Sequence, residues 1–139
     1  MITTRQKQIV QSTFIKVALV SNQAGEWFYK RLFELDPAIK PLFTTVNIHI
    51  QSTKLMQMLA IAVTGLDHLD ELTPILEDLG HRHITYGVTR EHYAIVKQAL
   101  MFALAHVLAL EFTPEAEEAW KQVYDLITSI MVEKNYESA

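Results

Sequence analysis

The spacing of apolar residues is the feature that most constrains the fold of this chain. Over residues 93–110 the intervals alternate between three and four, giving the series Tyr93, Val96, Leu100, Ala103, Val107 and Leu110. That period places all of them on one face of an α-helix, whereas a half-buried strand requires a period of two. Similar stripes recur along most of the chain, and no strand pattern persists. We therefore expect an all-α protein.

Capping signals divide this pattern into segments. Residues 113–115, Thr-Pro-Glu, offer a cap, a proline and an acid, and they predict the start of the last helix. Thr89 can cap the helix before it, and Gly87 is a stop signal for the one before that. Residues 36–43 begin with Asp-Pro and predict a short turn, and residues 44–50 a loop. The prediction is six long helices and a short one.

Composition narrows the class of protein further. The 139 residues suffice for one core, and we expect residues 1–139 to form a single domain. The chain has no cysteine, which excludes disulfides and thiolate ligands. Its net charge of −4, with acids and bases mixed, gives no basic footprint for nucleic acid. The N-terminus does not resemble a secretory signal, and the longest apolar run is too short for a bilayer. We expect a soluble, cytoplasmic protein that does not bind membranes.

One histidine continues an apolar stripe. His83 lies where the next core residue is expected after Leu72, Leu76 and Leu79. His81, two residues earlier, lies about 200° around the helix, so the two cannot bind one metal from a helix. His83 is therefore either a core histidine that donates a hydrogen bond to a carbonyl, or an inward-facing ligand.

Two further pairs of residues favour the second reading. Tyr29 and Phe33 are one helical turn apart, and so are Gln51 and Leu55. If the helix with Gln51 packs opposite the helix with His83, an apolar slot opens between them. A mainly apolar pocket with a few convergent polar groups is typical of a cofactor site.

Four motifs, in this order and spacing, resemble a known family. They are FYKRLFELDPAIKPLF at residues 28–43, QSTKLMQMLAIAVTGLDHL at 51–69, LGHRHITYGV at 79–88 and REHYAIVKQAL at 90–100. The chain resembles a single-domain bacterial globin, similar to the haem domain of flavohaemoglobins and to globins of thermophilic or acid-tolerant bacteria. The resemblance implies a globin fold around a pocket for haem b, iron protoporphyrin IX.

The resemblance assigns the proximal side of that pocket. His83 would be the iron ligand, and the Leu79 carbonyl is available to its other ring nitrogen. Tyr93 would tune the histidine, although its place on a stripe equally fits a plain core aromatic. The glutamate that flavohaemoglobins use on the last helix corresponds here to Asn135, with Glu133 nearby. This departure speaks against strong electron donation through the histidine.

The resemblance also assigns the distal side. Tyr29 and Gln51 would donate hydrogen bonds to bound dioxygen, and in a low-dielectric pocket such bonds are stronger than in water. Phe43 would pack flat against the porphyrin, and Leu55 would limit the movement of the ligand. If the chain before Gln51 shifts by two residues, His49 could bind the iron instead.

Residues at the edge of the pocket are assigned in the same way. Val88 would touch the haem edge, and Arg82 and Arg90 would pair with the propionates, although a solvated helix face explains both arginines equally well. The remaining large side chains are assigned to the core, namely Trp27, Met56, Met58, Trp120 and Tyr124.

Three functions remain open at this point. The first is reversible binding of dioxygen or another small gas, such as nitric oxide or carbon monoxide, for storage, delivery or scavenging. The second is nitric oxide dioxygenation, which would need an external reductase because the globin motifs occupy nearly the whole chain. The third is a sensor or, at the limit, a haem-free helical bundle. We expect a monomer or weak homodimer.

Overall fold

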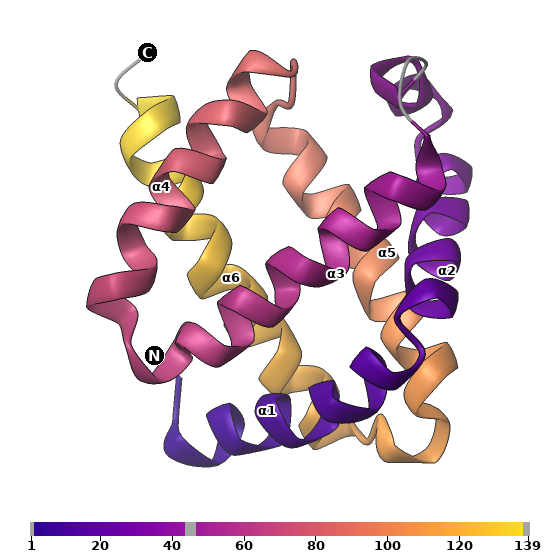
Figure 1. Cartoon of the computed structure of the whole chain (residues 1–139), viewed down its shortest axis with the longest axis vertical. Helices are drawn as coiled ribbons and strands as arrows, with labels where there is room; N and C mark the ends of the chain where they lie inside the picture. Colours follow the sequence, from indigo (N-terminus) through magenta and orange to yellow (C-terminus); the bar gives the residue numbers. More distant parts are fainter. Residues whose placement is uncertain (1, 44–46, 138–139) are drawn as a thin grey trace.

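The structure, a computed structural model, describes residues 2–43 and 47–137, with side chains through Glu133. Over these residues it forms six α-helices, three short 3-10 helices and no strand, which confirms the predicted all-α fold (Figure 1). The α-helices are α1 (Thr4–Leu19), α2 (Ser21–Leu35), α3 (Ile48–Thr64), α4 (Leu69–Thr85), α5 (Arg90–Leu108) and α6 (Pro114–Glu137). The 3-10 helices are η1 (Pro37–Phe43), η2 (Gly65–Asp67) and η3 (Ala109–Glu111).

The helices cross one another instead of forming a parallel bundle. Helix α2 packs against α3 and α5, α4 packs against α6, and α1 packs across α6 at one end of the molecule (Figure 1). From the turn at η2, α3 and α4 diverge (Figure 1). By length and hydropathy the stretch Arg90–Glu111 could cross a membrane, and in this fold it packs against α2 and α6.

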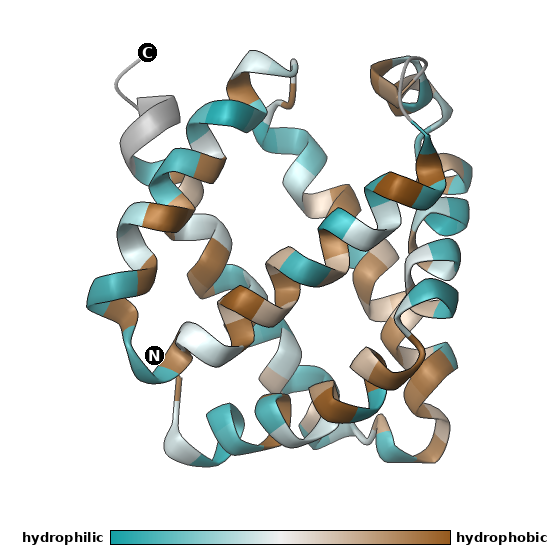
Figure 2. Cartoon of the chain, in the orientation of Figure 1, coloured by the Kyte–Doolittle hydropathy of each residue, from teal (hydrophilic) through white to brown (hydrophobic). Residues whose placement is uncertain are grey.

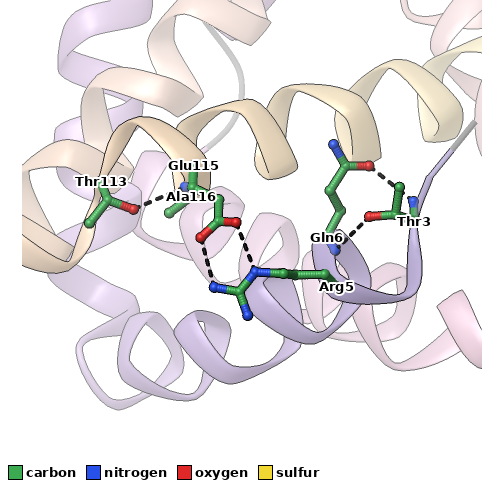
Figure 3. Close-up of polar contacts among 6 residues, drawn as sticks. All are labelled: Thr3, Arg5, Gln6, Thr113, Glu115 and Ala116. Atoms are coloured by element: carbon green, nitrogen blue, oxygen red, sulfur yellow. Dashed lines mark hydrogen bonds and ion pairs between the residues drawn. The ribbon is translucent and has the colours of Figure 1, made fainter.

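The predicted helix starts are confirmed in atomic detail. The Thr113 hydroxyl accepts a hydrogen bond from the Ala116 N–H at 3.1 Å, as Figure 3 shows, and Thr89 forms a capping box at the start of α5. Gly87, just after α4, has a φ of +89°, a left-handed conformation that favours glycine. At the start of α1, Arg5 forms two parallel 2.8 Å hydrogen bonds with Glu115 (Figure 3).

The loop predicted for residues 44–50 is wrong over its last part. Helix α3 begins at Ile48, because Asn47 caps it and accepts hydrogen bonds from the N–H groups of His49 at 2.8 Å and Ile50 at 3.3 Å. The start of this helix is set by the Asn47 cap, which a prediction based on the spacing of apolar residues does not detect. Residues 44–46 lie outside the part of the chain that the structure describes.

The buried side chains form two separate clusters. The larger joins α1, α2, α3, α5 and α6, and it includes Met56 and Trp120 as predicted. The smaller consists of Leu72, Leu76 and Met131, and places α4 against α6. Trp27 lies half-buried at the edge of the larger cluster, where it stacks on His106 with ring centroids 4.1 Å apart. The two clusters meet on α6, where the half-buried Ile127 borders both.

Candidate functional site

His83 lies in the last turns of α4, half-buried, with one ring nitrogen engaged. Its Nδ1 lies 2.8 Å from the carbonyl oxygen of Leu79, four residues earlier, as the sequence predicted. An Nδ1–H that donates to this carbonyl leaves the lone pair on Nε2, and the ring cannot turn without losing the bond. Burial, and to a lesser extent the charge of Arg82, lowers the pKa of His83, although the Leu79 hydrogen bond opposes this. The ring is therefore neutral at pH 7, in the form that binds metals.

One tyrosine stacks beside this histidine, and a second tyrosine is bonded to the first. The Tyr93 ring lies 6.3 Å from the His83 ring, centroid to centroid, with the planes 25° apart. The Tyr124 hydroxyl donates a 2.6 Å hydrogen bond to the Tyr93 backbone carbonyl, which ties α5 to α6. Sequence reasoning placed Tyr124 in the core and missed this bond, since nothing in the spacing of either helix signals it. The side chain of Asn135 lies outside the described residues.

Tyr29 faces the interior from α2 and is only 4% exposed. Burial raises the pKa of its hydroxyl to about 12, and a hydrogen bond with the Gln51 side chain lowers it in part. The hydroxyl therefore keeps its proton at neutral pH and remains a donor. The Phe43 ring meets the Tyr29 ring edge-on, with centroids 5.6 Å apart, and Phe33 lies 5.6 Å from Phe43. The structure thus brings Tyr29 together with Gln51 and with Phe43.

A close crossing of α2 and α3 makes the Tyr29–Gln51 contact possible. Gly25 lies one turn before Tyr29, and a Cβ added to it would stand 2.6 Å from the Cβ of Ser52. Any side chain at this position would push the helices apart. Sequence reasoning did not select Gly25 or Ser52. The available signal was a glycine inside a helical stripe, four residues before a candidate polar residue.

The remaining predicted site residues have different environments. Leu55, Leu79 and Val88 are half-buried, and the Val88 N–H donates to the His83 carbonyl at 3.0 Å. Arg82 is exposed and pairs with Asp78 on its own helix at 3.2 Å, so contact with a propionate would require it to leave this partner. His49 is exposed on the first turn of α3.

The residues present fit a haem group. The half-buried Phe43 and Leu55 border the larger core cluster, whereas the half-buried Leu79 and Tyr93 border the smaller one. Apolar side chains at the margins of both clusters are thus incompletely covered. His83, with its free lone pair, lies beside Tyr93 at the margin of the smaller cluster, and the protonated Tyr29 is available on α2. An apolar slot with one neutral imidazole and few polar donors is the environment that haem requires.

Comparison with known proteins agrees with this chemistry. The family model described as Globin matches residues 26–131. A flavohaemoprotein of Bacillus subtilis is 32% identical over 148 aligned residues, which cover 100% of this chain and 36% of that protein. Neuroglobin-1 of Oncorhynchus mykiss is 27% identical and is covered over 90% of its length. The chain spans about a third of the length of the flavohaemoproteins it matches.

Solved structures show the same fold. An engineered carbene transferase from Rhodothermus marinus superposes with a TM-score of 0.88 at 23% identity, covering 99% of this chain and 96% of that one. A hexacoordinated haem protein from an anhydrobiotic tardigrade gives a TM-score of 0.85 at 22% identity, covering 95% and 94%. The family match over most of the chain and the identity to a flavohaemoprotein agree with the crossed helices and the half-buried histidine: this chain belongs to the globin family and is a haem protein.

Proposed function

We propose that this globin reversibly binds dioxygen, and other small gases such as nitric oxide and carbon monoxide, at haem b. The observation that supports this best is the pairing of a buried, protonated Tyr29 on α2 with Gln51 on α3, together with the free Nε2 of His83 on α4. When bound, haem iron supplies the reversible coordination of a diatomic gas.

The distal side chains orient the gas ligand, donate hydrogen bonds to it and exclude water from the pocket. The hydroxyl of Tyr29 and the amide of Gln51 donate hydrogen bonds to the polar outer atom of a gas ligand. If each net bond contributes roughly 1.5 kcal/mol, one bond slows ligand release about tenfold and the two together about a hundredfold. Phe43 and Leu55 line the slot with apolar surface, which keeps bulk water from competing for the same donors.

On the proximal side, His83 holds the iron and Leu79 fixes the plane of its ring. A backbone carbonyl is a weaker acceptor than a carboxylate, so His83 remains an imidazole with little anionic character. Tyr93, whose ring stacks 6.3 Å from that of His83, would limit the tilt of the imidazole, and Leu79 and Val88 would contact a bound haem. These features suit gas binding better than peroxidase-like chemistry, which requires strong electron donation.

A second candidate function is nitric oxide dioxygenation. The identity to a flavohaemoprotein favours it, as does the carbene transferase, whose parent is described as a proposed nitric oxide dioxygenase. In this reaction one nitric oxide, one dioxygen and one electron give nitrate, so continued turnover needs an external reductase to return the electron. Nitrate yield over many cycles with a cellular reductase tests this function, and a single turnover would speak against it.

The first test of the proposal is spectroscopic. Ferric, ferrous and carbon monoxide spectra of the purified protein should each show a Soret band, and their pH dependence reports the coordination of the iron. The oxygen complex should then release its ligand slowly when mixed with excess carbon monoxide. A protein that takes up no haem would overturn the proposal. A ligand-induced change in a partner's activity would point instead to a gas or redox sensor. For both the gas-binding protein and the sensor, the localisation that we propose is the cytoplasm.

A further inference from the structure

A concave surface lies at the turn between α3 and α4. It is a groove of about 410 Å³, and none of its lining residues is among the predicted haem contacts. Ile61 and Thr64 line it from α3, and Glu71, Leu72 and Ile75 line it from α4. Leu72 is buried at its base, whereas Ile61 and Ile75 are 45% and 43% exposed at its rims. Large aliphatic side chains on both sides of one groove suit a partner that inserts an apolar residue.

The segment from η2 through α4, which forms one side of this groove, is strongly acidic. Residues 65–85 contain five carboxylates and one arginine, a formal charge of −4, which equals the net charge of the whole chain. With 12 basic and 16 acidic residues in total, 11 of each remain elsewhere, so the rest of the chain is neutral. Teal and brown segments accordingly alternate along α4 (Figure 2). The segment from η2 through α4 thus combines the excess negative charge, −3 of it on α4 itself, with exposed apolar residues.

Some of these carboxylates already have partners within the fold. Asp67 lies 3.4 Å from Lys7 and accepts a 3.0 Å hydrogen bond from Gln11, and Asp78 pairs with Arg82. Within the described part of the chain, Asp70 and Glu71 form no ion pair. Both are exposed, and Glu71 lines the groove itself.

Few basic groups oppose these two acids. Lys7, which approaches from α1, is paired with Asp67, and His68 lies on the groove. On α3, Lys54 lies about two turns before Ile61. The charge next to the groove is therefore negative, with Asp70 and Glu71 available to a partner.

We propose that the groove at the α3–α4 turn is a docking surface for a protein that presents basic side chains around an apolar one. Charge complementarity selects this occupant, because opposite potentials steer partners together and like potentials separate them. A second copy of this chain that docked through the same groove would bring the same acidic face and would be repelled. Anionic lipid headgroups and nucleic acid are disfavoured for the same reason. The proposal does not depend on which gas the haem binds.

A labelled peptide tests the surface on the full, haem-loaded chain. The probe is an 18-residue helical peptide with leucine along one face and lysine elsewhere, and its control has glutamate in place of lysine. Fluorescence anisotropy should show micromolar binding of the lysine peptide at low salt, weakened about tenfold or more between 20 and 200 mM salt. The glutamate peptide should not bind.

Matched variants separate the surface from general electrostatics. Asp70→Lys with Glu71→Lys should weaken binding about tenfold or more, whereas Glu26→Lys with Glu118→Lys, the same change in net charge elsewhere, should have a much smaller effect. Because acids in the first turn of α4 also stabilise its N-terminus, Asp70→Asn with Glu71→Gln gives a milder pair, expected to weaken binding by a smaller factor.

A second pair of variants tests the contribution of the apolar side chains of the groove. Ile75→Ser should weaken binding about three- to tenfold, whereas Ile15→Ser, an exposed isoleucine on α1, should leave it unchanged. Equal effects of the two charge-reversal pairs, or of the two serine variants, would show that the peptide binds by charge or hydrophobicity alone. Either result would overturn the proposal.

Discussion

The two sides of the proposed haem pocket are held in place by different kinds of interaction. On α4, the ring of His83 is oriented by the Leu79 carbonyl, one turn away on the same helix. On the other side, Tyr29 and Gln51 belong to different helices, and they meet because α2 and α3 cross closely at Gly25. The proximal arrangement is therefore local and the distal one tertiary. Substitutions on the proximal side should therefore change the absorption spectrum, and substitutions on the distal side should change the kinetics of ligand release.

The largest effect should follow removal of the proximal side chain. His83→Ala takes away the imidazole that holds the iron, so the Soret band of the purified protein should disappear or shift strongly. His81→Ala is the matched control, because this exposed histidine is two residues away and should leave the spectrum unchanged. Should His83→Ala retain the spectrum of the parent, the ligand assignment would be wrong.

Removal of the distal hydroxyl should affect kinetics and leave the Soret band in place. Tyr29→Phe deletes a buried donor with little change in shape, and oxygen release should become roughly ten- to a hundredfold faster if one to two net hydrogen bonds are lost. The rate is measured by displacement with carbon monoxide. Tyr86→Phe, on an exposed tyrosine, serves as the control. An unchanged rate in Tyr29→Phe would contradict the distal assignment.

A substitution at the close crossing of α2 and α3 should also change the rate of oxygen release, although it does not touch Tyr29 or Gln51 directly. Gly25→Ala places a Cβ against Ser52 and should cost about 1–3 kcal/mol in the free energy of unfolding, measured in urea. As the helices separate, the Tyr29–Gln51 hydrogen bond weakens, and oxygen release should become about three- to tenfold faster.

A second substitution checks this cause. Ser52→Gly removes the two side-chain atoms nearest the new methyl group and leaves only the Ser52 Cα, at 3.3 Å. The double variant should therefore recover a slow oxygen release, even though glycine in a helix is itself destabilising. If Gly25→Ala lowers stability but leaves the release rate unchanged, the distal pair does not depend on this crossing.

The same contrast explains what could be predicted from the sequence. The stripe that ends at His83 and the carbonyl at Leu79 are separated by fixed helical intervals, so their contact follows from periodicity alone. The Gly25–Ser52 approach joins residues on separate helices, and periodicity gives faces but no distances between helices. The loop predicted for residues 44–50 was wrong in its last three residues because a single cap, Asn47, starts α3 early.

The smallest expected effect tests whether the proximal side is as local as it appears. Tyr124→Phe removes the hydroxyl that donates to the Tyr93 carbonyl at 2.6 Å, which should lower the free energy of unfolding by about 0.5–1.5 kcal/mol in urea. Because the His83–Leu79 bond lies within α4, the Soret band and the rate of oxygen release should stay unchanged. A change in release as large as that of Tyr29→Phe would mean that tertiary contacts through α5 and α6 also orient His83. The contrast between the two sides would then fail.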